Sequence, residues 1–102
     1  MNSSILVIED DSNIQELISE FLSAEGYQVD TANDGLEGIQ KFKQGSYDLV
    51  ILDIMMPNLD GYGVCKMIRK SSSVPIIFLT ALNDEGDQLK GFDLECDDYI
   101  TK

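Results

Sequence analysis

Acidic residues follow directly on two short apolar runs of this sequence. Glu9 and Asp10 come after the run at 5–8, and Asp53 comes after the run at 49–52. If the runs are parallel strands, their carboxyl ends meet at one edge of a sheet, where ligands of such folds bind. Carboxylates that meet at one edge would repel one another. The three acids therefore need a bound cation, or raised pKa values that keep some of them protonated. Since no His and no nearby Cys is available, oxygen ligands here favour Mg²⁺.

A hydroxyl and an ammonium group follow two further apolar runs, as Thr80 and Lys102. Together with a carboxylate cation site they suit phosphoryl transfer, because the ion and the ammonium group neutralise charge on the phosphoryl oxygens. Asp53 would then be the nucleophile that forms an aspartyl-phosphate. Helix capping is the simpler explanation of any single acid of this kind, Asp11 included. Four strand ends with complementary chemistry favour a joint site.

The elements that must position these residues alternate along the chain. Apolar runs at 5–8, 49–52 and 76–79 predict buried strands, and two further short strands are expected at 27–32 and 99–101. Segments of helical period separate them, which is typical of βαβ units and a parallel sheet. The sequence therefore predicts an α/β domain.

The helix after the first strand has the clearest pattern. Its apolar stripe consists of Ile14, Leu17, Ile18, Phe21 and Leu22. Ser12 and Gln15 fit a capping box, and Gly26 ends the helix. In the second helix we expect Asp34 as the cap and Gly45 as the end. In the third helix we expect Val64, Met67 and Ile68 to point inward, and a fourth, weaker helix is expected over 83–95.

Composition narrows the classes of function. The 102 residues include 19 acids, 7 Lys or Arg and no His, for a net charge of −12. Contact with nucleic acid or an anionic membrane by this chain is disfavoured, and His-based hydrolysis or zinc binding is excluded. No apolar run approaches the about 20 residues of a membrane span, and no signal peptide is visible, so we expect a cytoplasmic protein. Cys65 and Cys96 are expected to be reduced thiols.

At these residues the sequence resembles the CheY-like receiver domain of two-component response regulators, and more closely its OmpR-type subclass. The resemblance rests on four motifs, 5–11, 52–61, 78–81 and 97–102, which read ILVIEDD, LDIMMPNLDG, FLTA and DDYITK. It implies a flavodoxin-like, doubly wound parallel sheet of five strands in the order 2-1-3-4-5, with helices on both faces.

The resemblance also implies a role for each site residue. Asp53 would accept a phosphoryl group from a sensor histidine kinase, while Glu9, Asp10, Asp53 and the backbone carbonyl of Met55 hold Mg²⁺. Thr80 and Lys102 would contact phosphoryl oxygens, and Ala81 would leave room for the group. Tyr99 would turn inward as an aromatic switch when Thr80 moves toward the phosphoryl group.

The subclass implies an output outside this chain. The receiver would be a switch and not an enzyme, followed by a separate DNA-binding domain for transcription regulation, and it would form a homodimer through its fourth helix and fifth strand. The family continues past the lysine with a fifth helix, whereas this sequence stops at Lys102. We therefore expect residues 1–102 to be a C-terminally incomplete receiver domain with exposed apolar sheet surface and a tendency to self-associate.

Three alternatives stay open. A Mg²⁺-dependent phosphohydrolase would use the same nucleophile, but haloacid-dehalogenase-like enzymes carry a second Asp two residues later, where this chain has Met55. A flavodoxin-like cofactor binder would need a phosphate cradle, which the acidic loop after the first strand does not resemble. An inert receiver used for protein contact would not need the acidic residues, the hydroxyl and the lysine together.

Overall fold

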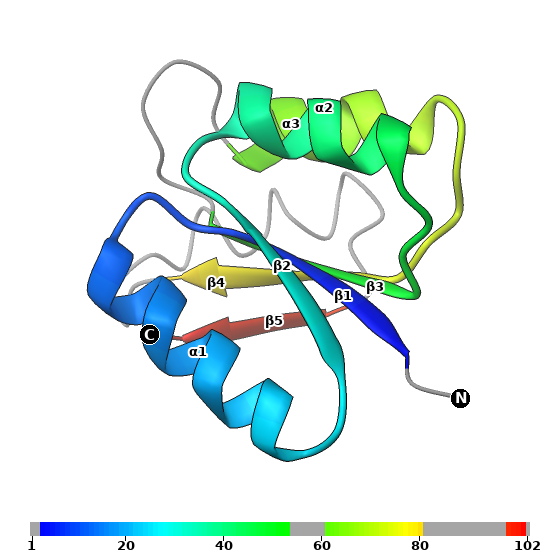
Figure 1. Ribbon diagram of the computed structural model, residues 1–102. Coiled ribbons are helices and arrows are strands. Elements are labelled where there is room, and N and C mark those ends of the chain that lie inside the picture. Colours follow the sequence, from blue (N-terminus) through cyan, green and yellow to red (C-terminus); the bar gives the residue numbers. More distant parts are fainter. Residues whose placement is uncertain (1–2, 54–60, 81–97, 102) are drawn as a thin grey trace.

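The computed structural model describes residues 3–53, 61–80 and 98–101, and of residues 80 and 98–101 it describes the course of the backbone. A parallel five-stranded sheet forms its centre, in the order β2-β1-β3-β4-β5 (Figure 1). The strands are β1 (Ser4–Ile8), β2 (Gln28–Ala32), β3 (Leu49–Asp53), β4 (Ile76–Thr80) and β5 (Asp98–Thr101). The described helices are α1 (Ser12–Ala24), α2 (Gly35–Gln44) and α3 (Gly61–Arg69). This confirms the predicted fold; the helix expected over 83–95 lies outside the described residues.

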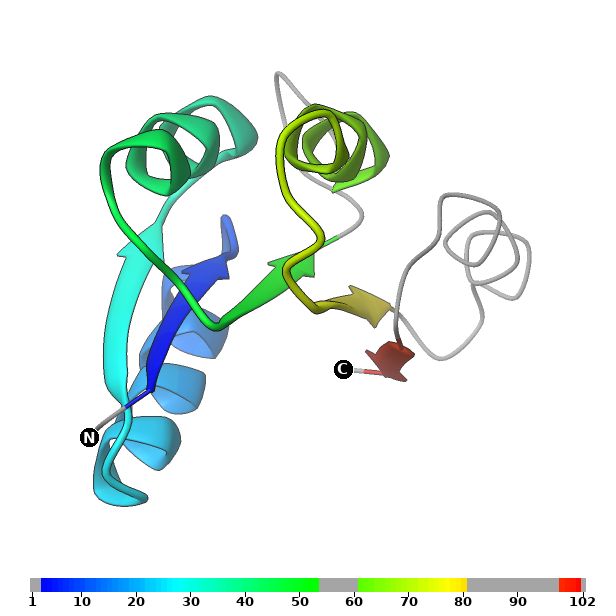
Figure 2. The same cartoon turned by 90° about the vertical axis from the view of Figure 1, so that its right-hand side faces the viewer.

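The helices lie on opposite faces of the sheet. In Figures 1 and 2, α1 covers one face, which we call the α1 face, and α2 and α3 lie side by side on the other, the α2/α3 face. The chain moves from β1 outward to β2 and then returns across the sheet to β3 and β4. Because crossovers between parallel strands are right-handed, this reversal of direction places α1 opposite the other two helices.

The α2/α3 face carries the larger buried core. Alternate strand residues point to it and are fully buried, namely Leu6, Ile8, Val50, Leu52, Ile76 and Phe78. Val64, Cys65 and Ile68 of α3 pack on them. The prediction that Met67 points inward is wrong, because it is 38% exposed. Cys65 takes the inward position instead, on the same side of α3 as the buried Gly61.

The α1 face is less completely covered. Its buried strand residues are Ile5, Val7, Ile51 and Leu79, and Ile18 and Leu22 of α1 pack against them. Leu17 is 68% exposed and Phe21 55% exposed, so the predicted apolar stripe of α1 is covered along one side only. An apolar hollow lies beside it, lined by Leu17, Ile18, Phe21, Leu22, Ile51 and Leu79.

The helix ends agree with the predicted signals in all but one case. Asp34 caps α2 by accepting a bond from the Glu37 N–H at 2.8 Å, and Gly45 is its C-terminal cap. Gly26 follows α1 with a φ of +96°, the left-handed conformation that glycine adopts without strain. The predicted capping box of Ser12 and Gln15 is wrong, since the cap of α1 is Asp11. Among the described helices, none has the length and apolar character needed to cross a membrane.

Candidate functional site

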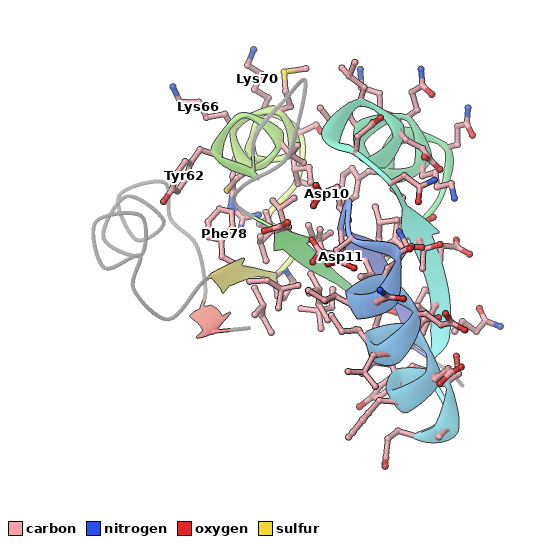
Figure 3. The ribbon with its side chains drawn as sticks, turned by 90° about the vertical axis from the view of Figure 1, so that its left-hand side faces the viewer. Asp10, Asp11, Tyr62, Lys66, Lys70 and Phe78 are labelled. Carbon is pink, nitrogen blue, oxygen red and sulfur yellow. The ribbon has the colours of Figure 1, made fainter. Side chains whose placement is uncertain are left out.

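Three carboxylates gather at the carboxyl edge of the sheet. Glu9 and Asp10 follow β1, and Asp53 ends β3. Ile8 and Leu52 pair in register on these two adjacent strands, so the residues that follow them lie side by side. One carboxylate oxygen from each of the three acids lies within 4.8 Å of the others. Figure 3 shows Asp10 at the end of β1, beside the tip of β3. The structure thus brings Asp53 together with two acids that lie more than 40 residues before it in the sequence.

Burial makes this acidic cluster unusual. Glu9 is 0% and Asp53 1% exposed, whereas Asp10 faces solvent. Both carboxylate oxygens of Glu9 and Oδ2 of Asp53 are shielded from water. Buried carboxylates at this separation oppose each other's ionisation, and a divalent cation relieves the repulsion. Oxygens bound to one Mg²⁺ lie no more than about 4.2 Å apart, and the three carboxylate oxygens already lie within 4.8 Å of one another. The donor set therefore fits a hard divalent cation.

Hydrogen bonds fix the backbone that carries the first two acids. The Glu9 N–H donates to the carbonyl of Ala32 at 3.1 Å, which extends the pairing of β1 with β2 by one residue. The side-chain amide of Gln15 donates to the carbonyls of Glu9 at 3.0 Å and Ala32 at 3.1 Å. Asp11 accepts bonds from the first N–H groups of α1. The acidic segment is therefore held by β2 and by the first turn of α1.

A chain of polar contacts extends from this segment toward α2. The Gln15 amide also reaches Oδ1 of Asn33 at 3.2 Å. The backbone and side-chain N–H groups of Asn33 both donate to Glu37, at 3.1 and 3.3 Å. Glu37 forms an ion pair with Lys41 at 3.3 Å, and Lys41 donates to the carbonyl of Thr31. The sequence analysis did not predict these contacts of Gln15 and Asn33. An amide side chain four residues after the cap of α1 could have indicated a contact with the backbone before the helix.

The other predicted site residues are described in part or not at all. Thr80 ends β4, one residue after Leu79, which pairs with Asp53 on β3. Its backbone therefore reaches the edge of the sheet where the acids lie. Tyr99 lies in β5, and its Cα pairs with that of Phe78. The side chains of Thr80 and Tyr99, and the whole of Met55, Ala81, Cys96 and Lys102, lie outside the described residues.

The fold and the site define the class: a doubly wound α/β domain with an acidic site at the carboxyl edge of its sheet. Residues 5–102 match the family described as response regulator receiver domain, and the chain belongs to that family. Among solved structures, the response regulator TrrA from Thermotoga maritima, in complex with Mg²⁺ and BeF, is 45% identical with a TM-score of 0.88. That similarity covers 100% of this chain and 87% of TrrA. The receiver domain of the Francisella response regulator 1452 is 34% identical with a TM-score of 0.91, over 99% of this chain and 84% of that one.

Curated relatives are longer than this chain. The probable transcriptional regulator ycf27 of Guillardia theta is 52% identical over 98 residues, which are 96% of this chain and 39% of that protein. The transcriptional regulatory protein YclJ of Bacillus subtilis strain 168 is 47% identical over 98 residues, 96% of this chain and 43% of YclJ. The chain therefore spans about two fifths of the length of these relatives.

Proposed function

We propose that this receiver domain accepts a phosphoryl group on Asp53 from a sensor histidine kinase, in a reaction that depends on Mg²⁺. The observation that carries the proposal is the cluster of buried Glu9, buried Asp53 and exposed Asp10, in which one carboxylate oxygen of each acid lies within 4.8 Å of the others. These three side chains, together with the backbone carbonyl of Met55, would hold the ion. TrrA, a receiver relative of 45% identity, was solved with Mg²⁺ and BeF, which supports this ion as the ligand.

In the proposed reaction a carboxylate oxygen of Asp53 attacks the phosphorus atom of a phosphohistidine. The new P–O bond forms as the P–N bond breaks, and the electron pair of the P–N bond returns to the imidazole of the donor. When bound, Mg²⁺ neutralises charge on the phosphoryl oxygens. Burial of Asp53 limits the access of water to the acyl phosphate. Thr80 and Lys102 would contact the phosphoryl oxygens, and Tyr99 would report the change as a switch residue.

The output is proposed to lie beyond these 102 residues. The similar proteins are named transcriptional regulators, and the chain spans about two fifths of their length. A separate domain would bind DNA, which agrees with the net charge of −12 on this one. In this proposal the protein is a cytoplasmic switch and not an enzyme, and the phosphorylated form dimerises through its fourth helix and β5.

We further propose that residues 1–102 form one receiver domain whose α1 face is completed by a later segment in the longer relatives. Two observations support this. The chain spans 84% and 87% of the two solved relatives named above. The α1 face also holds an apolar hollow, with Leu17 and Phe21 more than half exposed beside it.

Phosphorylation can be tested with the 102-residue chain, Mg²⁺ and a small-molecule phosphodonor such as acetyl phosphate. Intact-mass spectrometry should show the addition of one phosphoryl group. Asp53→Asn should abolish the addition, because the amide is not a nucleophile of this kind. Asp34→Asn is the matched control, since Asn caps a helix as well as Asp does, and it should be labelled like the wild type.

Three results would count against the assignment. Label that persists in Asp53→Asn would place the acceptor elsewhere. Label that forms equally well with excess chelator would remove the dependence on Mg²⁺. Sustained, multiple-turnover release of phosphate from a generic phosphate ester would favour a phosphohydrolase instead.

A further inference from the structure

Gln15, in the first turn of α1, connects the helix to the acidic segment through its side-chain amide. Its side chain does not complete a capping box but turns back over the acidic segment, where its Nε2 lies 3.0 Å from the carbonyl oxygen of Glu9. The same nitrogen lies 3.1 Å from the carbonyl oxygen of Ala32 and 3.2 Å from Oδ1 of Asn33. The orientation of the amide is unambiguous, because its oxygen would be repelled by all three acceptors.

The Glu9 carbonyl belongs to the peptide group that joins Glu9 to Asp10. Its orientation therefore controls how the two carboxylates stand relative to each other. On the other side of Glu9, the N–H group is bound to Ala32 at 3.1 Å. Ala32 thus accepts from both the Glu9 backbone and the Gln15 side chain. The Glu9 backbone is held from both directions, and the side chain that it carries is completely buried.

A rigid arrangement matters more for some cations than for others. Mg²⁺ demands near-ideal octahedral geometry, whereas Ca²⁺ accepts longer bonds and irregular coordination. Groups that orient the ligands without touching the ion commonly change metal affinity by about 10- to 100-fold. Loosening the peptide between Glu9 and Asp10 should therefore weaken Mg²⁺ binding more than Ca²⁺ binding.

We propose that Gln15 is a positioning residue that fixes the Glu9–Asp10 peptide and so sets both the affinity and the Mg²⁺ preference of the cation site. This inference rests on the proposed cation site and adds a residue that does not itself contact the ion. Asn33 supports the Gln15 amide from the side. Through Glu37 and Lys41, the positioning contacts reach α2 on the opposite face of the sheet.

The experiment measures dissociation constants for Mg²⁺ and for Ca²⁺ by isothermal titration calorimetry on the 102-residue chain. Gln15→Met keeps nearly the same length but removes the donor. We expect its Mg²⁺ dissociation constant to rise about 10-fold, with a smaller rise for Ca²⁺. Gln40→Met is the matched control, because Gln40 is exposed on α2 and should leave both constants unchanged.

The possible outcomes separate this inference from the proposed function. If the wild type binds Mg²⁺ and Gln15→Met binds it equally well, the role of Gln15 is overturned and the cation site stands. If both ions weaken by the same factor, Gln15 only supports the fold and the inference is also overturned. If the wild type itself shows no Mg²⁺ binding, the cation site fails and the inference fails with it.

A second variant keeps the test decisive if Gln15→Met does not fold. Asn33→Ala changes an exposed residue and removes one of the three acceptors of the Gln15 amide. We expect a smaller loss of Mg²⁺ affinity with the same shift of preference toward Ca²⁺. An unchanged ratio of the two constants in this variant would overturn the inference.

Discussion

The two faces of the sheet differ in how completely they are covered. On the α2/α3 face, two adjacent helices bury the strand side chains, and Tyr62 of α3 packs edge-to-face on Phe78 at 5.5 Å between ring centroids (Figure 3). On the α1 face, within the part of the chain that the structure describes, α1 covers the sheet beside a hollow that Ile51 and Leu79 line. The two surfaces come from the same strands, because successive residues point to opposite sides.

The more complete packing of the α2/α3 face stabilises the strand ends that carry the site. Ile8 and Leu52, which directly precede Glu9 and Asp53, are fully buried in the α2/α3 core. The strand ends that carry the acids are thus anchored in the core of the α2/α3 face. The α1 face contributes less to holding these strand ends in place. It leaves apolar surface that another segment could cover.

Two adjacent residues of β4 give the largest expected contrast. Phe78 faces α3, and Leu79 faces the hollow on the α1 face. Phe78→Ala should lower the free energy of unfolding by about 3–5 kcal/mol, since it leaves a cavity in a closed core. Leu79→Ala should cost about 2 kcal/mol, at the low end for such changes, because one side of Leu79 already borders open space. Urea denaturation of both variants checks this, and equal losses would contradict the contrast between the faces.

Close packing of α2 on β1 predicts the next effect. A Cβ atom at position 38 would lie 2.5 Å from Cδ1 and 2.8 Å from Cγ1 of Ile8. Gly38→Ala should therefore destabilise the domain by about 1–3 kcal/mol, although alanine is the better helix former. Ile8→Val removes the nearest methyl group, so the double variant should be more stable than the sum of the two single changes predicts. Additive losses in denaturant melts would mean that the contact is easily relieved.

Tyr47 joins the loop before β3 to β2 and should give a smaller, pH-dependent effect. Its hydroxyl donates to Asp30 at 2.7 Å. Burial, followed by the hydrogen bond and the charge of Asp30, raises the pKa of Tyr47 from 10.0 to about 12. Because the folded-state pKa is raised, this stabilisation is complete below pH 10 and is lost as the pH rises toward 12.

Tyr47→Phe should accordingly cost about 1 kcal/mol at neutral pH. The difference from the wild type should shrink above pH 10, measured by denaturant melts at a series of pH values. A difference that stays constant to high pH would show that the hydroxyl contributes no proton-linked stability.

The smallest change in the free energy of unfolding is expected for a substitution on the α1 face. Phe21→Gln should change the free energy of unfolding by less than about 0.5 kcal/mol, because Phe21 is already 55% exposed. The same change should weaken self-association of the 102-residue chain, measured by sedimentation. Association should strengthen with salt, which screens the repulsion between copies of charge −12. Leu36→Gln, equally exposed on α2, is the control, and a monomeric wild type at high salt would contradict the prediction.

Much of the fold could be predicted from the sequence, because fully buried parallel strands read as continuous apolar runs. The runs at 5–8, 49–52 and 76–79 fall within β1, β3 and β4. The direction in which α3 faces could not be predicted, since the spacings 64, 67, 68 and 61, 64, 65, 68 both fit one side of a helix. Packing in the folded domain selected Cys65 for the inward position rather than Met67.

The meeting of Glu9, Asp10 and Asp53 could also be predicted, because parallel strands end at one edge of a sheet. The contacts of Gln15 could not. Asp11 and Ser12 are both good caps, and the sequence does not say which of them the chain uses. Once Asp11 takes that role, the amide one turn later is released from capping, and the position of β2 decides where it binds.

The contact between Gly38 and Ile8 also constrains how this domain can change over generations. Since a methyl group at position 38 would overlap the side chain at position 8, a larger residue in α2 becomes acceptable after a smaller one has appeared in β1. The two positions are 30 apart in sequence but share one volume in the core. Among related sequences they should therefore vary together, with their combined side-chain size held nearly constant.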